Sequence, residues 1–393
     1  MEFKKLWTRD FVLVVLANGL AFSTICVTGA VLSLYIVRQF DGDAVQVGLI
    51  SSLMTLSTFL FRPFTGYLVD RFGRKWTLTA ALILDALISF SLLLPTGLVG
   101  LGILRFLIGF PFALFSTGLN TLTADLIPEE RRSEGLGISS IVTTISGQVL
   151  APILALWLLG DANFHSVFIF AGLLAVIATC LVLLTRTADI KNGSLSFSFA
   201  SLIEKRVLWL ALVMGLTFLG WPGLLTYGPL MAEEAGFINA SPFLMAFGIG
   251  LLFSQLLGKR LFNLTAPRRA GGMALLILVS GFVLVGFVHV KLAFLLGGGL
   301  MGTGFGLSFA IFPVMAVNLV EADRRGACNA TIIFGQDVGV FIGSYVFGWT
   351  ARAAGNYGSS YGLVGLLLLL PLAVFLFSAL PDYQRRVKSS VTD

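Results

Sequence analysis

Residues 363–380 read LVGLLLLLPLAVFLFSAL, a stretch without a charged side chain. A helix needs about 20 such apolar residues to cross the hydrocarbon core of a bilayer. Backbone groups in lipid must be hydrogen-bonded within the segment itself, so a run of this kind predicts a helix. A strand of a membrane barrel alternates apolar and polar residues, and this stretch does not alternate.

Apolar stretches of similar length recur along the whole chain. Of the 393 residues, 57% are hydrophobic and only 12% are charged, whereas soluble domains carry about 25% charged residues. The fold class predicted is therefore an all-α membrane protein with twelve transmembrane helices. The expected spans lie near residues 11–37, 46–69, 76–95, 99–126, 134–158, 166–185, 208–233, 241–261, 270–289, 292–320, 327–351 and 361–380.

The basic residues indicate how the chain is oriented. With twelve spans, both ends and the even-numbered gaps share one side, and 21 of the 26 Lys and Arg residues fall there. The other five are Arg38, Lys291 and Arg352 on the opposite side, and Arg62 and Arg105 within spans. Positive charge favours the cytoplasmic side, so we expect a multi-pass protein of the plasma (inner) membrane with both termini cytoplasmic. The net charge of +6 then reports topology, and no nucleic-acid partner is expected.

The chain also divides into two halves. Its longest polar stretch, near residues 186–207, falls at the midpoint. We expect an N-terminal six-helix bundle at 1–186, a cytoplasmic linker at 187–207, and a C-terminal six-helix bundle with a cytoplasmic tail at 208–393. The sequence ADLIPEERR at 124–132 is partly repeated as VNLVEADRR at 317–325, which is a trace of duplication. Such repeats are typical of transporters whose substrate site lies between two bundles.

The loop between the second and third spans reads GYLVDRFGRK, residues 66–75. A short turn between antiparallel helices favours a residue with positive φ, which Gly73 can adopt. Gly66 permits a neighbouring helix to approach closely. Asp70 can meet a helix N-terminus or an arginine. The alternative is a positively charged loop whose other residues are incidental.

This loop resembles the signature loop of the major facilitator superfamily, Gly-x-Leu-x-Asp-Arg-x-Gly-Arg-Arg/Lys, and the resemblance in topology covers the whole chain. It implies a monomeric transporter without a cofactor. It also implies a cytoplasmic latch in which Asp70 contacts the start of span eleven, near residues 326–329, and Arg71 pairs with Asp125. The latch residues would be Gly66, Asp70, Arg71, Gly73, Arg74 and Asp125. The second half lacks a full copy of the loop, so the latch is expected to be asymmetric.

Span five contains GQVLAP, residues 147–152. The run is similar to the Gly-x-x-x-Gly-Pro element of exporters and antiporters in that superfamily, with Ala151 in place of the second glycine. Gly147 permits close helix contact, and Pro152 frees a carbonyl and bends the helix. The resemblance implies proton-coupled efflux. The alternative is a kink that serves packing alone.

Charged residues within spans are costly unless they are paired or hydrated, so they are functional candidates. Arg105 resembles the arginine of the superfamily's fourth span, which is linked there to proton transfer; the alternative is a side chain that snorkels to the outer surface. Asp337 resembles an acid of span eleven in drug exporters, and it precedes Gly339 and Gly343, which offer a close-packing face. Asp85 is central in span three. Either acid could take up protons or could serve as a structural hydrogen-bonding group.

Further polar and aromatic residues within the spans could line a substrate cavity. The candidates are Asn18, Arg62, Asn120, Gln148, Trp221, Tyr227 and Gln336. Arg62 could instead pair with the carboxylates of the loop, and an aromatic residue such as Trp221 could instead contact lipid or serve packing. Many drug exporters of the superfamily carry an acid in span one, where this chain has Asn18. Proton coupling would then depend on Asp337 or Asp85.

The function expected from these features is proton-coupled efflux of a small amphipathic drug or metabolite by alternating access. An uptake symporter or uniporter for a sugar or another nutrient is the alternative. An enzyme is not expected, because no nucleophile–base pair, phosphate-binding loop or metal cluster is evident in the sequence. The cysteines Cys26, Cys180 and Cys328 lie in separate apolar segments and suggest no metal site. The partners expected are a small-molecule substrate, protons and the lipid bilayer.

Overall fold

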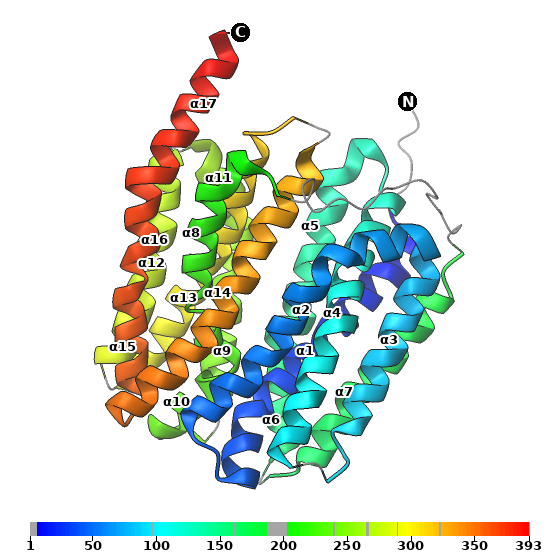
Figure 1. Ribbon diagram of the computed structural model, residues 1–393, viewed down its shortest axis with the longest axis vertical. Coiled ribbons are helices and arrows are strands. Elements are labelled where there is room, and N and C mark those ends of the chain that lie inside the picture. Colours follow the sequence, from blue (N-terminus) through cyan, green and yellow to red (C-terminus); the bar gives the residue numbers. More distant parts are fainter. Residues whose placement is uncertain are drawn as a thin grey trace. The chain divides into compact units, whose positions relative to one another are not determined.

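The structure is a computed structural model that describes residues 6–95, 97–160, 162–186, 203–238, 240–264, 267–288, 290–321 and 324–392. Throughout this described part the regular structure is helical, and the all-α class and the twelve spans are confirmed (Figure 1). Nine spans are single helices: α1 (Arg9–Phe40), α2 (Ala44–Phe72), α3 (Arg74–Ser91), α4 (Leu98–Leu126), α7 (Phe164–Leu183), α11 (Ser241–Leu264), α12 (Pro267–Phe287), α13 (Lys291–Val317) and α14 (Arg325–Ala354). Residues 187–202 of the expected linker lie outside the described residues.

Three spans are built from several helical pieces. The fifth is α5 (Arg132–Thr143), the π-helical η2 (Thr144–Leu150) and α6 (Ala151–Leu159). The seventh is η4 (Lys205–Val207), α8 (Leu208–Phe218), α9 (Pro222–Leu225) and α10 (Gly228–Glu234). The twelfth is α15 (Tyr357–Leu367), α16 (Leu369–Val374), the π-helical η6 (Phe375–Ala379) and α17 (Leu380–Thr392). Prolines or glycines lie at or near most of these interruptions, among them Pro152, Gly220, Pro222, Gly228, Pro371 and Pro381, and these residues most readily break a helix.

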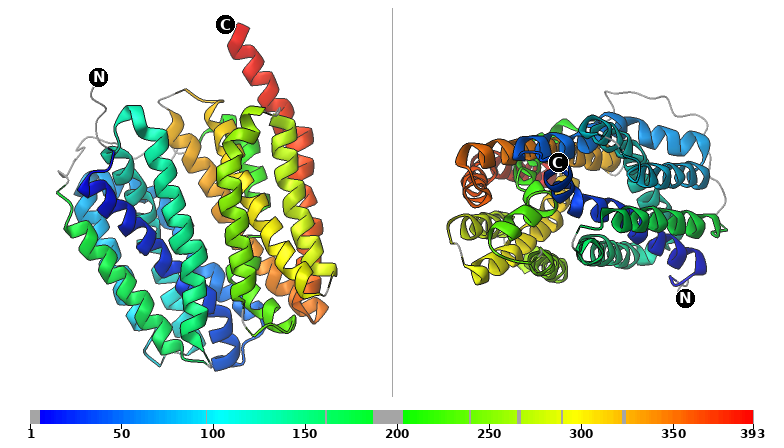
Figure 2. Two further views of the ribbon diagram at one scale, coloured as in Figure 1. Left: turned by 180° about the vertical axis from the view of Figure 1, so that it is seen from behind. Right: turned by 90° about the horizontal axis from the view of Figure 1, so that it is seen from below.

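The chain forms two compact units. The first comprises residues 1–41 and 53–197, and the second comprises 42–52 and 198–393. In the first unit, α1 packs against α4, α7, η2 and α6, while α3 packs against α4 and α7 (Figure 1). In the second unit, α13 packs against both α11 and α12, α14 packs against α8, and α12 packs against α15 (Figure 2). The segment 42–52, at the start of α2, groups with the second unit although the sequence division assigns it to the first half.

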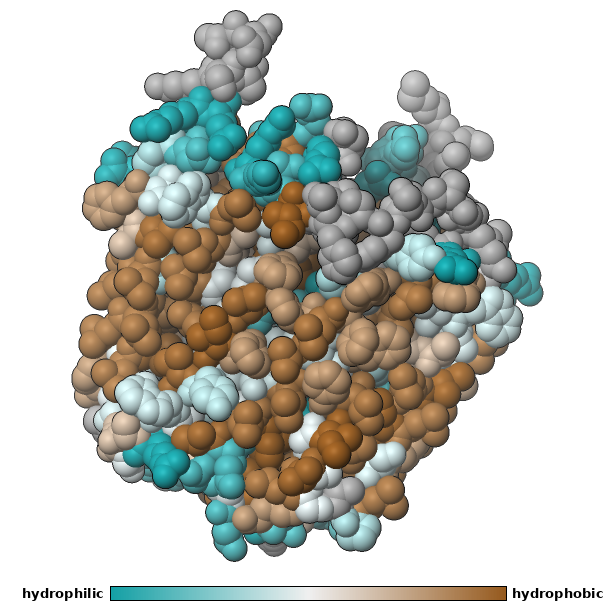
Figure 3. All heavy atoms as spheres, viewed as in Figure 1, coloured by the Kyte–Doolittle hydropathy of each residue, from teal (hydrophilic) through white to brown (hydrophobic). Residues whose placement is uncertain are grey.

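The outer surface of these helices is apolar. Figure 3 shows hydrophobic residues covering most of one face, with hydrophilic residues gathered toward its two ends. Large apolar side chains such as Leu87, Ile103 and Trp157 are more than half exposed. Ten helices of the described part are long and apolar enough to span a membrane. An apolar face of this extent suits contact with lipid tails, so the chain is a multi-pass membrane protein.

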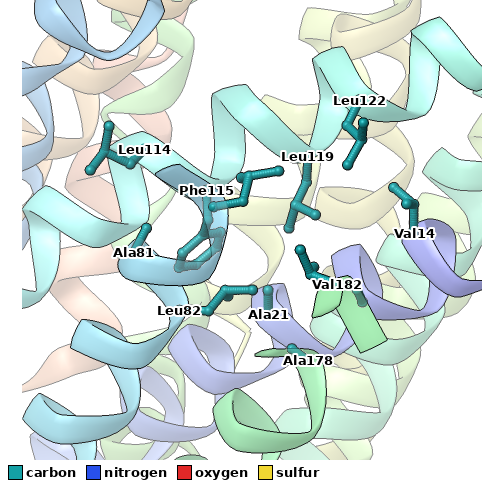
Figure 4. Packing of buried hydrophobic residues seen from close by; sticks show 12 residues of the cluster. Val14, Ala21, Ala81, Leu82, Leu114, Phe115, Leu119, Leu122, Ala178 and Val182 are labelled. Atoms are coloured by element: carbon teal, nitrogen blue, oxygen red, sulfur yellow. The ribbon is translucent and has the colours of Figure 1, made fainter. Parts of the chain in front are cut away.

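A hydrophobic core joins α1, α3, α4 and α7 in the first unit (Figure 4). Ala21, Ala81 and Ala178 are almost completely buried in it, and their small side chains let the helix backbones approach closely. Larger residues such as Phe115 and Leu119 fill the space between the helices. Polar residues on α1 are thereby held at fixed depths relative to those on α3 and α4.

Glycines allow α8 and α14 to pack tightly in the second unit. A Cβ atom added at Gly339 would lie 2.0 Å from the carbonyl oxygen of Gly215, and one added at Gly343 would lie 2.3 Å from that of Leu219. Such distances leave no room for a side chain, so the helices meet backbone to backbone. The close-packing face expected at Gly339 and Gly343 is confirmed.

The last residues before α8 are fastened to α14 within the second unit. The Glu204 carboxylate is buried and accepts a hydrogen bond from Nε of Arg324 at 2.9 Å. The backbone N–H of Glu204 donates to Oγ1 of Thr331, also at 2.9 Å. Burial raises the pKa of the Glu204 carboxyl. The hydrogen bonds from the Arg206 backbone N–H and from Arg324, together with the charges of these two arginines, outweigh burial and hold that pKa below its ordinary value.

We therefore expect the protein to lose stability when Glu204 is protonated. A lowered folded pKa means that the contribution is complete above the unfolded pKa of glutamate, about 4.3, and is lost as the pH falls through the lower folded pKa. Glu204→Gln should reduce the free energy of unfolding at pH 7 by about 1–3 kcal/mol. Thermal unfolding of both proteins in detergent, from pH 7 to pH 3, checks this. Equal stability of the two proteins at pH 7 would contradict a stabilising role of the ionised Glu204 carboxylate.

Candidate functional site

Four buried polar residues of the first unit lie close together along α1: Thr24 and Thr28 on α1 itself, Asp85 on α3 and Arg105 on α4. Asp85 on α3 is 0% exposed, and Thr24 Oγ1 donates a hydrogen bond to its Oδ2 at 2.8 Å. Arg105 on α4 is 5% exposed, and its Nη1 lies 3.5 Å from Thr28 Oγ1. Thr24 and Thr28 are one helical turn apart on α1. The two charged residues are thus connected through α1, each by way of one threonine.

Both charged groups retain atoms without a partner. Within the described part of the chain, Asp85 Oδ1 and Arg105 Nε are buried and make no hydrogen bond, and no ion pair is described between the two residues. Ionisable groups placed in an apolar interior without direct pairing are costly, so both residues remain candidates for a functional role. The burial of Arg105 excludes the alternative in which its side chain snorkels to the surface.

Span five changes its helical form at the predicted kink. The π-helical segment η2 includes Gly147, and Pro152 follows at the start of α6. A Cβ atom added at Gly147 would lie 3.2 Å from Phe22 Cβ on α1, and one added at Gly19 would lie 2.7 Å from Ser146 Oγ. The element therefore combines a helix distortion with close contact to α1. Wider π-helical turns of this kind are frequent at functional sites.

Two of the predicted cavity residues meet in an amide cluster. Asn18 Nδ2 on α1 donates to Asn120 Oδ1 on α4 at 3.2 Å and lies 3.5 Å from Ser139 Oγ on α5. Asn120 is exposed, and its own Nδ2 donates to the Ser116 carbonyl at 2.8 Å. Asn18 Oδ1 is buried and has no partner in the described structure. Gln148, also predicted for the cavity, is half-buried on η2.

In the second unit, Trp221 lies where span seven is interrupted. Its ring stacks on Phe218 with centroids 5.4 Å apart and meets Phe305 edge-on at 5.1 Å. Trp221 is half-buried, as are Gln336 and Asp337 on α14. The predicted span at 208–233 is present, but it is interrupted between α8 and α9 and between α9 and α10, which the sequence analysis did not foresee. Gly220, Pro222, Gly228 and Pro229 are the signals that could have revealed the break.

Tyr227, which was also predicted to line a cavity, lies inside the second unit in this structure. Its side chain is completely buried, and its ring stacks on Phe347. The hydroxyl lies 3.0 Å from the carbonyl oxygens of both Ala44 and Ser344, to which it donates. Tyr227 instead fastens the segment 42–52 to α14 within the second unit.

The signature loop forms a different ion pair from the one expected. Arg74, not Arg71, pairs with Asp125, whereas Arg71 donates to the Tyr67 hydroxyl. Arg74 is the better placed of the two because it begins α3, directly after the turn at Gly73. That glycine has a φ of 91°, which confirms the expected positive φ.

Gly66 and Asp70 are the other residues of the signature loop that were predicted to form the latch. Gly66 lies within α2, and the side chain of Asp70 is outside the described part of the structure, so the expected contact of Asp70 with span eleven stays a prediction. Arg62 is half-buried on α2, immediately before Pro63.

Neutralising Arg74 should therefore matter more than neutralising Arg71. We expect Arg74→Gln to lower the free energy of unfolding by about 1 kcal/mol, since a partly buried pair loses one partner. Arg71→Gln, which leaves the pair intact, serves as the matched control and should change it by less than half as much. Thermal unfolding of the purified variants compares the two. A larger loss of stability from Arg71→Gln would instead support the pairing of Arg71 with Asp125 that was expected from the sequence.

Comparison with known proteins identifies the family. The sequence profile of the Major Facilitator Superfamily matches residues 11–269, more than half of the chain. The chain belongs to the major facilitator superfamily. As a member of this superfamily, it is a membrane-embedded secondary transporter of small molecules.

Several transporters of this superfamily resemble the chain over most of its length. The staphylopine export protein of Staphylococcus aureus is 24% identical over 87% of this chain and 90% of its own length. The hexuronate transporter of Bacillus subtilis is 24% identical over 85% of this chain and 86% of its own. A crystal structure of a bacterial homologue of the human lysosomal transporter Spinster has a TM-score of 0.75 and 14% identity, covering 99% of this chain and 98% of the other. That structure shows the shared fold alone.

Three residues of the site were not among the sequence predictions. Thr24, Thr28 and Ser139 carry the contacts of the charged and amide groups, yet threonine and serine are common in membrane helices, where they usually bond to their own backbone. Only the packing of α1 against α3, α4 and α5 distinguishes them. The sequence offered no signal for that packing.

Proposed function

We propose that this protein exports a small amphipathic drug or metabolite in exchange for protons by alternating access. The observation that carries the proposal is the buried carboxyl of Asp85. It is bonded to α1 through Thr24 and lies in the same unit as the buried Arg105. A carboxyl in such a place is a candidate to bind a proton in one state and release it in another.

This proposal also accounts for the lack of an acidic residue in span one. The chain has Asn18 on α1 and no carboxylate in the apolar part of that helix. Asp85 comes from α3 instead, and the hydroxyl of Thr24 brings it into contact with α1. Arg105 contacts the same helix through Thr28, so a proton at Asp85 and the charge at Arg105 would both act on α1. Asp337, half-buried on α14, remains a second candidate for the coupling acid.

The direction proposed rests on span five. The π-helical turn at Gly147, followed by Ala151 and Pro152, resembles the Gly-x-x-x-Gly-Pro element of exporters except for Ala151, and the staphylopine export protein is among the similar chains. An uptake symporter or uniporter is the second candidate, because the hexuronate transporter is about equally similar. We further propose a monomer of the inner membrane with cytoplasmic termini, in which the pair of Arg74 and Asp125 belongs to the cytoplasmic latch.

Transport in proteoliposomes separates the two candidates. The substrate, first identified by a screen for protection against thermal unfolding, is offered outside vesicles whose interior is acidic. Antiport predicts accumulation as protons leave, and dissipation of the pH gradient should stop it. Accumulation only when the exterior is acidic would indicate symport and would reject export.

A further inference from the structure

The amide cluster of the first unit has one property that its internal contacts do not explain. Asn18 is 1% exposed, and its Oδ1 has no hydrogen-bond partner in the described part of the chain. An unsatisfied buried acceptor costs about 1–3 kcal/mol. Most buried polar atoms in proteins have a partner, so this oxygen indicates a group that is bound only at some stage of the protein's work.

The surrounding contacts fix which way the amide points. Asn120 Nδ2 donates to the Ser116 carbonyl, so Asn120 Oδ1 faces Asn18 and must meet a donor. Both N–H groups of Asn18 are then directed to Asn120 Oδ1 and Ser139 Oγ. The orphan atom is therefore the carbonyl oxygen of Asn18, an acceptor. Its missing partner must carry an O–H or N–H group.

The cluster is uncharged. Asn18, Asn120, Ser116 and Ser139 provide only amide, hydroxyl and backbone groups. An ammonium group would satisfy the acceptor but would leave its charge without a carboxylate, at a high desolvation cost. A carboxylate would bring a second acceptor against Asn18 Oδ1. A hydroxyl or a carboxamide fits best, because each can donate to Asn18 and accept from the Ser139 hydroxyl or from the second N–H of Asn120.

An aromatic surface lies beside the cluster on the same helix. Phe22 follows Asn18 by one turn, so both side chains share a face of α1. The Phe22 ring is half-buried and meets Phe112 edge-on with centroids 5.6 Å apart. Gly147 lets η2 pack closely behind Phe22, since a Cβ atom added there would lie 3.2 Å from Phe22 Cβ. A polar acceptor next to an aromatic ring suits a ligand with a polar end and an apolar body.

We infer that Asn18, Asn120 and Ser139 bind the uncharged polar end of the transported compound, a hydroxyl or carboxamide, while Phe22 contacts its apolar part. The inference rests on the proposed transport of a small amphipathic compound and names its chemical class. Asn120 is the exposed member of the cluster and is the point of entry, so its side chain turns aside to admit the ligand to Asn18. The site lies about 9 Å along α1 from Thr24, at 1.5 Å per residue, so ligand and proton occupy separate places on one helix.

Binding of four related compounds tests the inference. The probes are phenylacetamide, 2-phenylethanol, 2-phenylethylamine and phenylacetate, which share a ring and differ in the polar end. Titration of the full-length protein in detergent, at pH 7 and without any gradient, should show the amide and the alcohol binding at least about tenfold more tightly than the ammonium and the carboxylate, a difference of about 1.4 kcal/mol. Equal affinities, binding of the charged probes alone, or no binding by any probe would each overturn it.

Variants then assign the preference to the cluster. Asn18→Leu and, as a milder change, Ser139→Ala should each reduce amide and alcohol binding about tenfold, the effect of one lost hydrogen bond. Ser23→Ala is the matched control, because the buried Ser23 hydroxyl bonds to the Gly19 carbonyl of its own helix. Retained preference in both cluster variants would contradict the inference. Because no proton gradient is used, failure here leaves the proton-exchange proposal standing, and failure of exchange in vesicles leaves this site standing.

Discussion

Asp85→Asn should abolish substrate accumulation driven by a pH gradient. A gradient of two pH units supplies about 2.7 kcal/mol per proton, enough for up to about 100-fold accumulation with one-for-one exchange. The amide side chain keeps the size of the carboxyl and can still accept from Thr24, but it cannot carry a proton. Accumulation should therefore fall to the level of passive equilibration, measured with labelled substrate in acid-interior proteoliposomes.

The same variant should still exchange substrate for substrate when no gradient is present, because binding and the conformational change remain. Ser89→Ala is the control: Ser89 lies one turn after Asp85 on α3, is completely buried, and its hydroxyl makes no hydrogen bond in the described structure. That variant should accumulate substrate as the wild type does. If Asp85→Asn accumulates normally, Asp337 becomes the coupling candidate and Asp337→Asn is the next variant.

Gly339→Ala should destabilise the second unit strongly. The new Cβ would lie 2.0 Å from the Gly215 carbonyl oxygen, so α14 and α8 must separate at their closest contact. Overpacking of this kind costs about 1–3 kcal/mol, and more when backbone must move. The midpoint of thermal unfolding in detergent should fall clearly, and transport should fall with it.

Gly272→Ala on α12 is the matched control for that change. A Cβ atom at Gly272 would meet nothing within 4 Å, and alanine is favoured over glycine in a helix by about 1 kcal/mol. Gly339→Ala should therefore lower the midpoint of thermal unfolding, whereas Gly272→Ala should raise it or leave it unchanged. Equal losses from both would mean that the contact between α8 and α14 is not the cause.

The sequence predicted the fold well because the dominant forces act locally. Apolar length determines a span such as α1 or α13, and Gly73 must turn the chain between α2 and α3 whatever the neighbours are. The interrupted seventh span was missed because hydropathy does not register a break. The apolar residues from 208 to 233 are equally favourable in lipid as one helix or as three.

The site was harder to predict, since it depends on which helices meet. Asp85 and Arg105 were recognised as costly charges within spans, but only the structure connects them to α1 through Thr24 and Thr28. Tyr227 illustrates the opposite case. Its hydroxyl suggested a cavity residue, yet it bonds to the backbone carbonyls of Ala44 and Ser344, a partnership between residues far apart in sequence. Arg71 and Arg74 likewise differ only in position on the loop, and packing decides which of them reaches Asp125.

Proton movement itself tests the central proposal most directly. Proteoliposomes containing the wild-type protein and an enclosed pH-sensitive dye are prepared with equal pH on both sides, and a tenfold inward gradient of substrate is imposed. Proton-coupled exchange predicts that entering substrate drives protons out, so the interior becomes alkaline by up to about one pH unit for one-for-one exchange. An interior that becomes acidic, or a pH that does not change while labelled substrate enters, would contradict it.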